Sequence, residues 1–137
     1  MLLKNLFNAT ESLQNAIEIY DMRKKNLASE NELKVLEAGV IQNFEFTYEL
    51  CWKFIKRWLK ENVSPDCADG ITRRELFRLA FENKLINNVE DWMQFHNARN
   101  FSSHIYDKVI SDEILEYCFK FLPYAKELYE NLERHHD

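Results

Sequence analysis

The sequence predicts an all-α protein: an up-and-down bundle of about five helices in a single domain spanning residues 1–137. Only two glycines and two prolines occur, far below the usual ~7% and ~5% of residues, so the frequent turns that a strand-rich fold needs are missing. Hydrophobic residues make up 46% of the chain and aromatic residues 14%, which is enough for a packed core. Apolar residues also recur at helical spacing along most of the chain.

The first two expected helices are long. Helical periodicity predicts the first over residues 2–25, ending in three cations that are favourable at a helix C-terminus. The second is expected over residues 32–62 and ends before Pro65, because the residue preceding a proline disfavours helical geometry. Its apolar residues form two seams: Val40, Phe44, Thr47, Cys51, Phe54 and Trp58 in one, and Ile41, Tyr48, Trp52, Ile55 and Leu59 in the other.

Two apolar seams on one helix imply that it is buried on two sides. We expect one seam to fill the core of the monomer and the other to be covered by a second copy of the chain or by a partner subunit.

Three shorter helices follow. Thr72 and Glu75 have the spacing of a capping box, which predicts the start of the third. A fourth is expected to begin near Asn88 and to run into residues 99–106. The fifth is expected after residues 111–113, with a kink at Pro123 inside it.

Charge, cysteine content and hydropathy narrow the function classes. The formal net charge is −5, so any site for a polyanion has to be local. The three cysteines lack CxxC spacing, which suits reduced thiols in a cytoplasmic protein, and two of them, Cys51 and Cys118, fall on apolar helix positions. No signal-peptide core or membrane-spanning run is present, so we expect a soluble protein without a membrane partner.

Missing motifs exclude several kinds of enzyme. Gly39 and Gly70 are the only glycines, so no glycine-rich phosphate loop can form. His96 and His104 are too few ligands for a zinc site, and no Asp-x-Asp pair of the kind that holds magnesium in nucleotidyl transfer is present. We therefore expect no metal and no cofactor, and the chain is not expected to be a nucleotidyltransferase itself.

Residues 99–106 concentrate the groups that bind phosphate or move protons, among them Arg99, Asn100, His104 and Tyr106. On a continuous helix the side chains of Asn100 and His104 would point ~40° apart around the helix axis, whereas those of Arg99 and His104 would point ~140° apart. Arg99 can therefore join His104 only if the helix ends near residues 102–103, or if a second copy supplies one of the two groups. We favour a cleft shared between two copies, because the twin-seamed helix independently predicts a dimer.

Such a cleft suits cleavage of an RNA phosphodiester without a metal, with His104 as a proton-transfer group and Arg99 on the phosphate. Glu45, which interrupts an apolar seam, needs a partner such as an arginine, and Glu45 and Ser103 are candidates for supporting the site. A plainer interpretation competes, since Arg, Asn and His at a helix end are often caps or surface groups. The lysine row Lys53, Lys56 and Lys60 is likewise expected to be a solvated face rather than an RNA track.

Two segments resemble a known family. Residues 39–53 (GVIQNFEFTYELCWK) resemble the signature helix of the nucleotidyltransferase substrate-binding proteins, which belong to the HEPN superfamily. Residues 99–107 (RNFSSHIYD) resemble the second hallmark of that family. The two motifs stand in the expected order and spacing, and the likeness covers nearly the whole chain.

The resemblance implies a homodimeric, four-helix-bundle-like protein encoded beside a separate minimal nucleotidyltransferase. Some similar proteins are HepT-like ribonuclease toxins of toxin–antitoxin pairs. Arg99 and His104 match their Arg-x4-His motif, and Asn100 matches its usual polar companion. Tyr106 completes the longer Arg-x4-His-x-Tyr pattern, whose tyrosine the partner transferase modifies with AMP.

Two functions follow from the resemblance. The first is a metal-independent endoribonuclease that acts on RNA as a homodimer and is inhibited by AMPylation of Tyr106. The alternative is a non-catalytic subunit that binds a substrate or nucleotide for the transferase. The intact Arg99, His104 and Tyr106 set favours the first, and the acidic net charge favours the second.

Overall fold

The computed structural model describes residues 2–104 and 106–135, and within these ranges it contains five α-helices and no strand. The all-α class and the five predicted helices are confirmed. The helices are α1 (Leu3–Lys25), α2 (Glu30–Asn62), α3 (Arg73–Glu82), α4 (Val89–Phe101) and α5 (Lys108–Arg134), with a one-turn 3-10 helix, η1 (Ser102–His104), after α4.

Side-chain caps fix where helices α2, α3, α4 and α5 begin. The Glu75 N–H donates to Thr72 Oγ1 over 3.1 Å, which confirms the predicted start of α3. Asn88 Oδ1 accepts from the Asp91 N–H over 3.0 Å and begins α4 where expected. Helix α2 begins at Glu30, two residues before the predicted start, because Ser29 caps it.

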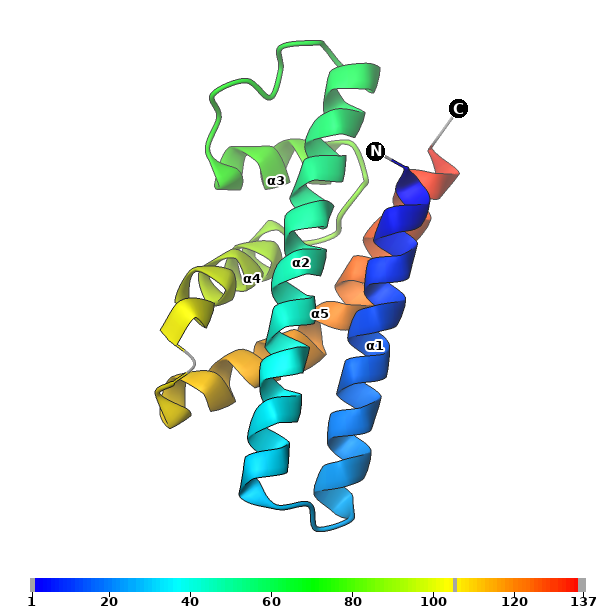
Figure 1. Cartoon of the computed structure of the whole chain (residues 1–137). Helices are drawn as coiled ribbons and strands as arrows, with labels where there is room; N and C mark the ends of the chain where they lie inside the picture. Colours follow the sequence, from blue (N-terminus) through cyan, green and yellow to red (C-terminus); the bar gives the residue numbers. More distant parts are fainter. Residues whose placement is uncertain (1, 105, 136–137) are drawn as a thin grey trace.

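The predicted start of α5 is wrong. We expected this helix after residues 111–113, but it begins at Lys108 because Asp107 caps it. The Asp107 carboxylate accepts from the backbone N–H of Val109 over 3.0 Å and of Ile110 over 3.4 Å. Helix α5 remains helical through Pro123, and its axis changes direction along its course (Figure 1).

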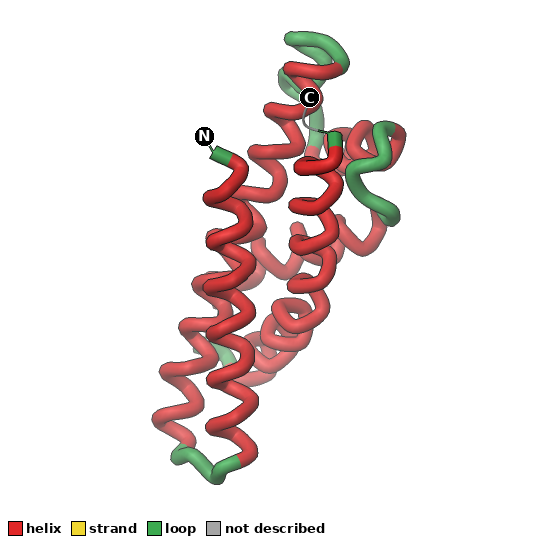
Figure 2. The backbone as a smooth tube through the Cα atoms, turned by 90° about the vertical axis from the view of Figure 1, so that its right-hand side faces the viewer, coloured by secondary structure: helices red, strands yellow, loops and turns green. Residues whose placement is uncertain are grey.

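The long helices α1 and α2 run side by side, and the C-terminal part of α5 lies next to α1 (Figure 1). Helices α3 and α4 and the first part of α5 lie on the other side of α2. The view turned by 90° shows the same helices joined by loops, among them the long connection over residues 63–72 between α2 and α3 (Figure 2). None of the described helices combines the length and hydropathy needed to span a bilayer.

Both seams of α2 are buried within one chain, which overturns the argument that one seam needs a second copy. Flanking helices on both sides of α2 cover it, α1 and α5 on one side and α3 and α4 on the other. The fully covered positions come from both seams: Val40, Ile41, Phe44, Thr47, Tyr48, Cys51, Phe54, Ile55 and Leu59. Burial of α2 therefore provides no support for a dimer.

An aromatic cluster ties α2, α3, α4 and α5 together. Phe121 of α5 lies at its centre, with ring centroids 5.1 Å from Phe44, 5.1 Å from Phe95 and 5.7 Å from Trp92. Phe77 of α3 joins through Trp92 at 5.6 Å. These rings are almost completely buried, and edge-to-face pairs at such distances stabilise a core beyond their buried area. The cluster fixes the position of α4, whose last turn carries the predicted site.

Candidate functional site

Arg99 lies in the last turn of α4 and extends across to α2. Its Nη1 is 3.0 Å from Glu45 Oε2, and its Nε is 3.4 Å from Glu49 Oε1. About a third of each of the three side chains is exposed, with 33% for Arg99 and 28% and 37% for the carboxylates. Glu45 therefore has the arginine partner that its place in an apolar seam requires, and that arginine belongs to the same chain.

Ser102 holds this ion pair in place. The chain leaves α-helical geometry after Phe101 and forms η1, so the helix ends where a break was considered. The Ser102 hydroxyl accepts from Arg99 Nη1 over 3.2 Å and lies within hydrogen-bond distance of both Glu45 Oε2 and the Arg99 carbonyl. Ser102 is 2% exposed. Ser103, the serine proposed to support the site, is exposed and has no hydrogen bond to this cluster in the described part of the chain.

His104 and Tyr106 form an exposed pair beyond the end of α4. His104 Nδ1 lies 3.4 Å from the Tyr106 hydroxyl, and the two rings meet edge to face with centroids 6.0 Å apart. Tyr106 is 82% exposed. Ile105, which lies between them in the motif, falls outside the described residues. An imidazole and a phenol thus face solvent together, where a ligand or another protein can reach both.

Asn100 belongs to a third polar group that sequence reasoning missed. The Tyr48 hydroxyl is 2.7 Å from His96 Nδ1, and His96 Nε2 is 3.4 Å from the Asn100 amide nitrogen. Burial raises the pKa of the Tyr48 phenol well above its usual range, so this group stays protonated. Burial first, and then the Arg73 guanidinium, lower the pKa of His96 and favour its neutral form.

Trp52 and Arg73 extend the polar cluster away from Arg99. The Trp52 indole N–H donates to Glu49 Oε2 over 3.0 Å, and the Arg73 guanidinium carbon lies 3.7 Å from the centre of the indole ring. Sequence reasoning placed Trp52 in an apolar seam and gave Arg73 no role. A single sequence shows the aromatic and the cation, but it does not show that α3 brings Arg73 onto α2.

The structure brings some of the predicted groups together and leaves others apart. Glu45 and Arg99 are joined, and so are His104 and Tyr106. No hydrogen bond or ion pair among the described residues links Arg99 to His104. The end of α4 after Phe101 thus places no direct bond between the imidazole and the guanidinium within the described part of the chain.

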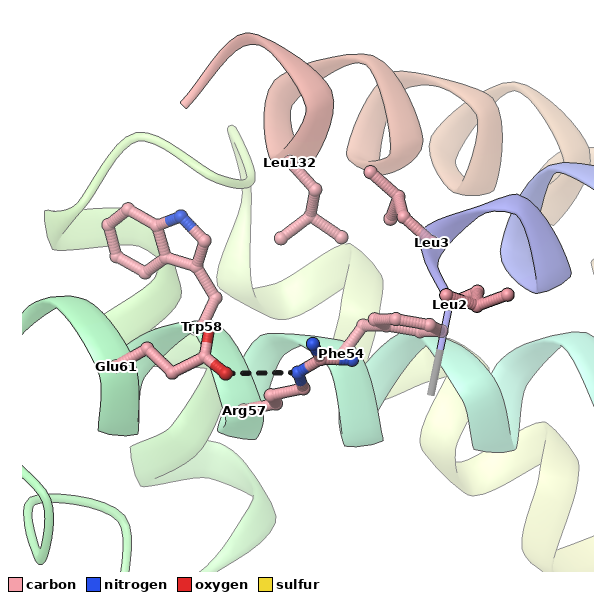
Figure 3. A pocket seen from close by; sticks show the side chains of 7 residues that line it. All are labelled: Leu2, Leu3, Phe54, Arg57, Trp58, Glu61 and Leu132. Atoms are coloured by element: carbon pink, nitrogen blue, oxygen red, sulfur yellow. Dashed lines mark hydrogen bonds and ion pairs between the residues drawn. The ribbon is translucent and has the colours of Figure 1, made fainter. Parts of the chain in front are cut away.

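Two hollows lie apart from the Arg99 contacts. One is beside Tyr106 and is lined by Lys34, Glu37, Ala38, Ile41, Lys108 and Ser111. The other lies at the opposite end of α2, between the first turn of α1 and the last turns of α5 (Figure 3). Leu2, Leu3, Phe54, Trp58 and Leu132 surround it, and the Arg57–Glu61 ion pair lies at its edge. No group of three or more His, Cys, Asp or Glu side chains in the described ranges is arranged to hold a metal ion.

Comparison with known proteins finds related sequences. A family model described as nucleotidyltransferase substrate binding protein like matches residues 2–134. A Haemophilus influenzae protein named as a probable ribonuclease HepT is 29% identical over 122 residues, which is 88% of this chain and 84% of the relative.

Solved structures share the fold. One, from Haemophilus influenzae, is described as revealing the fold of a substrate binding domain of a nucleotidyltransferase; it superposes with a TM-score of 0.89 at 29% identity, covering 96% of this chain and 99% of the other. A second, from Thermus thermophilus, superposes with a TM-score of 0.63 at 23% identity, covering 94% and 99%. The second supports the fold alone.

Proposed function

The chain belongs to the nucleotidyltransferase substrate-binding protein-like family. We propose that it is a ribonuclease that forms a two-protein system with a separate minimal nucleotidyltransferase. The observation that carries this proposal is the exposed His104–Tyr106 pair, 3.4 Å apart, directly after the helix turn that holds Arg99. The relative named as a probable ribonuclease supports the same assignment. The two proteins would act in the cytoplasm as a toxin and its antitoxin.

The proposed reaction is RNA cleavage without a metal. The 2′-hydroxyl of the substrate attacks the adjacent phosphorus, the new O–P bond closes a 2′,3′-cyclic phosphate, and the bond to the 5′-oxygen breaks. His104 takes the proton of the 2′-hydroxyl, and a protonated group must return one to the leaving 5′-oxygen. Arg99 binds the phosphate and stabilises its developing charge, with Asn100 as a further donor.

The proposed active unit is a homodimer in which Arg99 of one copy faces His104 of the other. Within one chain Arg99 is directed at Glu45 and Glu49 on α2, whereas His104 contacts Tyr106. Exposed apolar side chains next to the site offer a surface for a second copy: Phe46 is 60% exposed, Phe101 57% and Val109 67%.

Mixing two inactive variants tests the shared site. Arg99→Ala and His104→Ala are each expected to be inactive. An equal mixture should recover roughly a quarter of the wild-type rate, because half of randomly formed dimers are mixed and each mixed dimer keeps one intact site. No recovery, with exchange between dimers verified, would mean that the two groups act within one chain.

Ribonuclease activity is tested directly with purified protein and RNA in EDTA. His104→Ala is expected to lower the rate by roughly 10²- to 10⁴-fold, and His135→Ala, which removes an exposed histidine at the end of α5, should leave it unchanged. If wild type and His104→Ala both leave RNA intact in all buffers, the proposal that the chain is a ribonuclease is wrong. Equal cleavage by both would exclude His104 as the catalytic group.

Regulation is proposed to occur at Tyr106. Its hydroxyl would attack the α-phosphorus of ATP held by the partner transferase, forming a Tyr–O–P bond and releasing pyrophosphate, while His104 Nδ1 at 3.4 Å receives the phenol proton. The AMP group would add bulk and negative charge beside a phosphate-binding site and so repel RNA. Tyr106→Phe should abolish labelling by the transferase with ATP, and Tyr117→Phe should not. Undiminished labelling of Tyr106→Phe would place the acceptor elsewhere.

One observation favours the alternative of a non-catalytic binding subunit. Two carboxylates, Glu45 and Glu49, surround the Arg99 guanidinium and offset its charge, in a chain that is already acidic. Under this alternative the transferase would still bind the chain, and nucleotide or substrate would bind at the cluster without any RNA being cleaved. The RNA assay in EDTA separates the two functions.

A further inference from the structure

The second half of α2 collects positive charge in a chain that is acidic overall. Residues 53–60 contain Lys53, Lys56, Arg57 and Lys60 and no carboxylate, although the formal net charge of the chain is −5. These four cations, together with Trp52 and Glu61, line a shallow groove along the helix. A local cluster of this kind is what a polyanion needs in order to bind an acidic protein.

Three of the cations are available to a ligand. Arg57 pairs with Glu61 over 3.1 Å. Lys53, Lys56 and Lys60 form no ion pair with a carboxylate in the described ranges, and their spacing of three and four residues places them along one face of α2. The row extends ~10 Å along the helix axis. It therefore offers a line of ammonium groups rather than a single point charge.

An aromatic platform stands at the end of this row that is nearer Arg99. The Arg73 guanidinium lies 3.7 Å from the centre of the Trp52 ring, and Lys53 Nζ lies 5.7 Å from it. Nucleic-acid bases stack on aromatic rings and on guanidinium planes, and such stacking beside a basic groove is typical of proteins that bind single strands. The groove therefore combines groups for phosphates with groups for unpaired bases.

Side-chain contacts connect the Trp52 end of the groove to the candidate site. The Trp52 indole N–H donates to one oxygen of Glu49 over 3.0 Å, and the other oxygen of Glu49 lies 3.4 Å from Arg99 Nε. From Glu45, the partner of Arg99, to Lys60 the helix rises ~22 Å, which is enough for several nucleotides of an extended strand.

We propose that the groove along Trp52, Lys53, Lys56 and Lys60 is the path on which single-stranded RNA approaches Arg99, with the three lysines on its phosphates and the Trp52–Arg73 pair against its bases. This inference deepens the proposed ribonuclease function and rests on RNA being the substrate. It departs from the expectation that the lysine row is only a solvated face, because it adds Arg73 and the link to Arg99.

The test measures binding without cleavage. A fluorescent single-stranded RNA is titrated with protein carrying His104→Ala, and the binding constant is followed from low to high salt by anisotropy. The combined change Lys53→Gln, Lys56→Gln and Lys60→Gln should weaken binding ~10- to 100-fold near 0.1 M salt. It should also reduce the slope of log K against log salt by about 2, since each phosphate contact on a single strand contributes ~0.7.

The control changes the same charge elsewhere. Lys4, Lys24 and Lys25 are exposed on α1, and their combined change to Gln should leave the salt slope as it is. Circular dichroism and urea unfolding verify that both triple variants fold. An equal loss in the two triples would mean that only net charge matters and would overturn the proposal.

The remaining outcomes separate this inference from the proposed function. If the parent protein binds RNA and the Lys53, Lys56 and Lys60 triple binds it equally well, the path is wrong while the ribonuclease proposal stands. If the parent binds no RNA, both fail together. If the triple binds RNA normally but loses the partner transferase, the groove is a protein-docking surface and the RNA path is wrong.

Discussion

Helix α4 carries two regions of opposite character. Its first half buries Trp92 and Phe95 among rings from α2, α3 and α5. Its last turn holds Arg99 and Asn100 among partly exposed charges and hydrogen-bonding groups. The first region is complete within one chain. The second ends in the exposed His104–Tyr106 pair and, on our proposal, needs a second copy and a ligand. The difference suggests that the core positions α4 and that the polar end is where function can vary.

The largest expected effect contrasts these regions by the same substitution. Phe121→Ala removes the ring at the centre of the aromatic cluster and is expected to lower the free energy of unfolding by about 3–5 kcal/mol, because the cavity cannot fully collapse. Phe101→Ala removes a ring that is 57% exposed at the polar end and, measured at protein concentrations where the chain is monomeric, should change it by no more than about 0.5 kcal/mol. Urea unfolding of both variants measures the contrast, and equal losses would contradict it.

A second contrast lies inside the polar region. Ser102→Ala deletes the buried hydroxyl that contacts Glu45 and Arg99, and we expect a loss of about 1–2 kcal/mol because both partners lose a hydrogen bond. Ser103→Ala, on the exposed neighbour, is expected to be neutral. Unfolding in urea again gives the free energies. A neutral Ser102→Ala would show that Arg99 is held by its carboxylates alone.

The sequence predicted the fold well because each helix carries its own signals. Thr72 and Asn88 are N-cap residue types, and both start helices where expected. Asp107 is also an N-cap type, but the apolar pattern after it favoured a later start for α5. The two seams of α2 were correctly predicted to be buried. What covers them could not be predicted, since that depends on how four other helices pack.

The site was predicted at the level of residues and not of contacts. Residues 99–106 stood out by composition, and Glu45 stood out as a carboxylate in an apolar seam that needed an arginine. The roles of Ser102, His96 and Arg73 depend on contacts between α2, α3 and α4 that have no local sequence signal. A histidine one helical turn before Arg99 was the only hint of the Tyr48–His96–Asn100 group.

A smaller effect is expected where the core meets the polar end. Tyr48 is 1% exposed, and its hydroxyl lies 2.7 Å from His96 Nδ1, while the Asn100 amide nitrogen, which can only donate, lies 3.4 Å from His96 Nε2. Nε2 of neutral His96 therefore accepts, and the ring hydrogen lies on Nδ1, facing the Tyr48 hydroxyl. Tyr48→Phe should cost about 1 kcal/mol and shift His96 toward the Nε2–H tautomer, because Nδ1–H loses its acceptor, as read from imidazole ¹⁵N shifts. Tyr124→Phe, which removes a hydroxyl bonded to Asp91, should leave those shifts unchanged. An unchanged His96 in Tyr48→Phe would mean that the phenol does not set the tautomer.

The smallest expected effect is a pH dependence of stability caused by His96. Its pKa in the folded chain is lowered, mainly by burial and then by Arg73, against an opposing effect of Glu49. In the unfolded chain the imidazole titrates near its ordinary value of about 6.5. As the pH falls through that value, the unfolded chain takes up the proton first, so acid weakens the fold.

The loss of unfolding free energy accumulates as the pH falls from the ordinary pKa of histidine to the lowered pKa of His96 in the folded chain. It is absent at pH 8, where the imidazole is neutral in both the folded and the unfolded chain. Because the side chain is partly exposed, solvent screening keeps the term below ~1 kcal/mol. Subtracting the unfolding free energies of His96→Gln from those of wild type at each pH isolates the term, since glutamine does not titrate. A difference that stays constant from pH 8 to pH 5 would show that burial and Arg73 do not hold His96 in its neutral form at the point where the core of α4 meets its polar end.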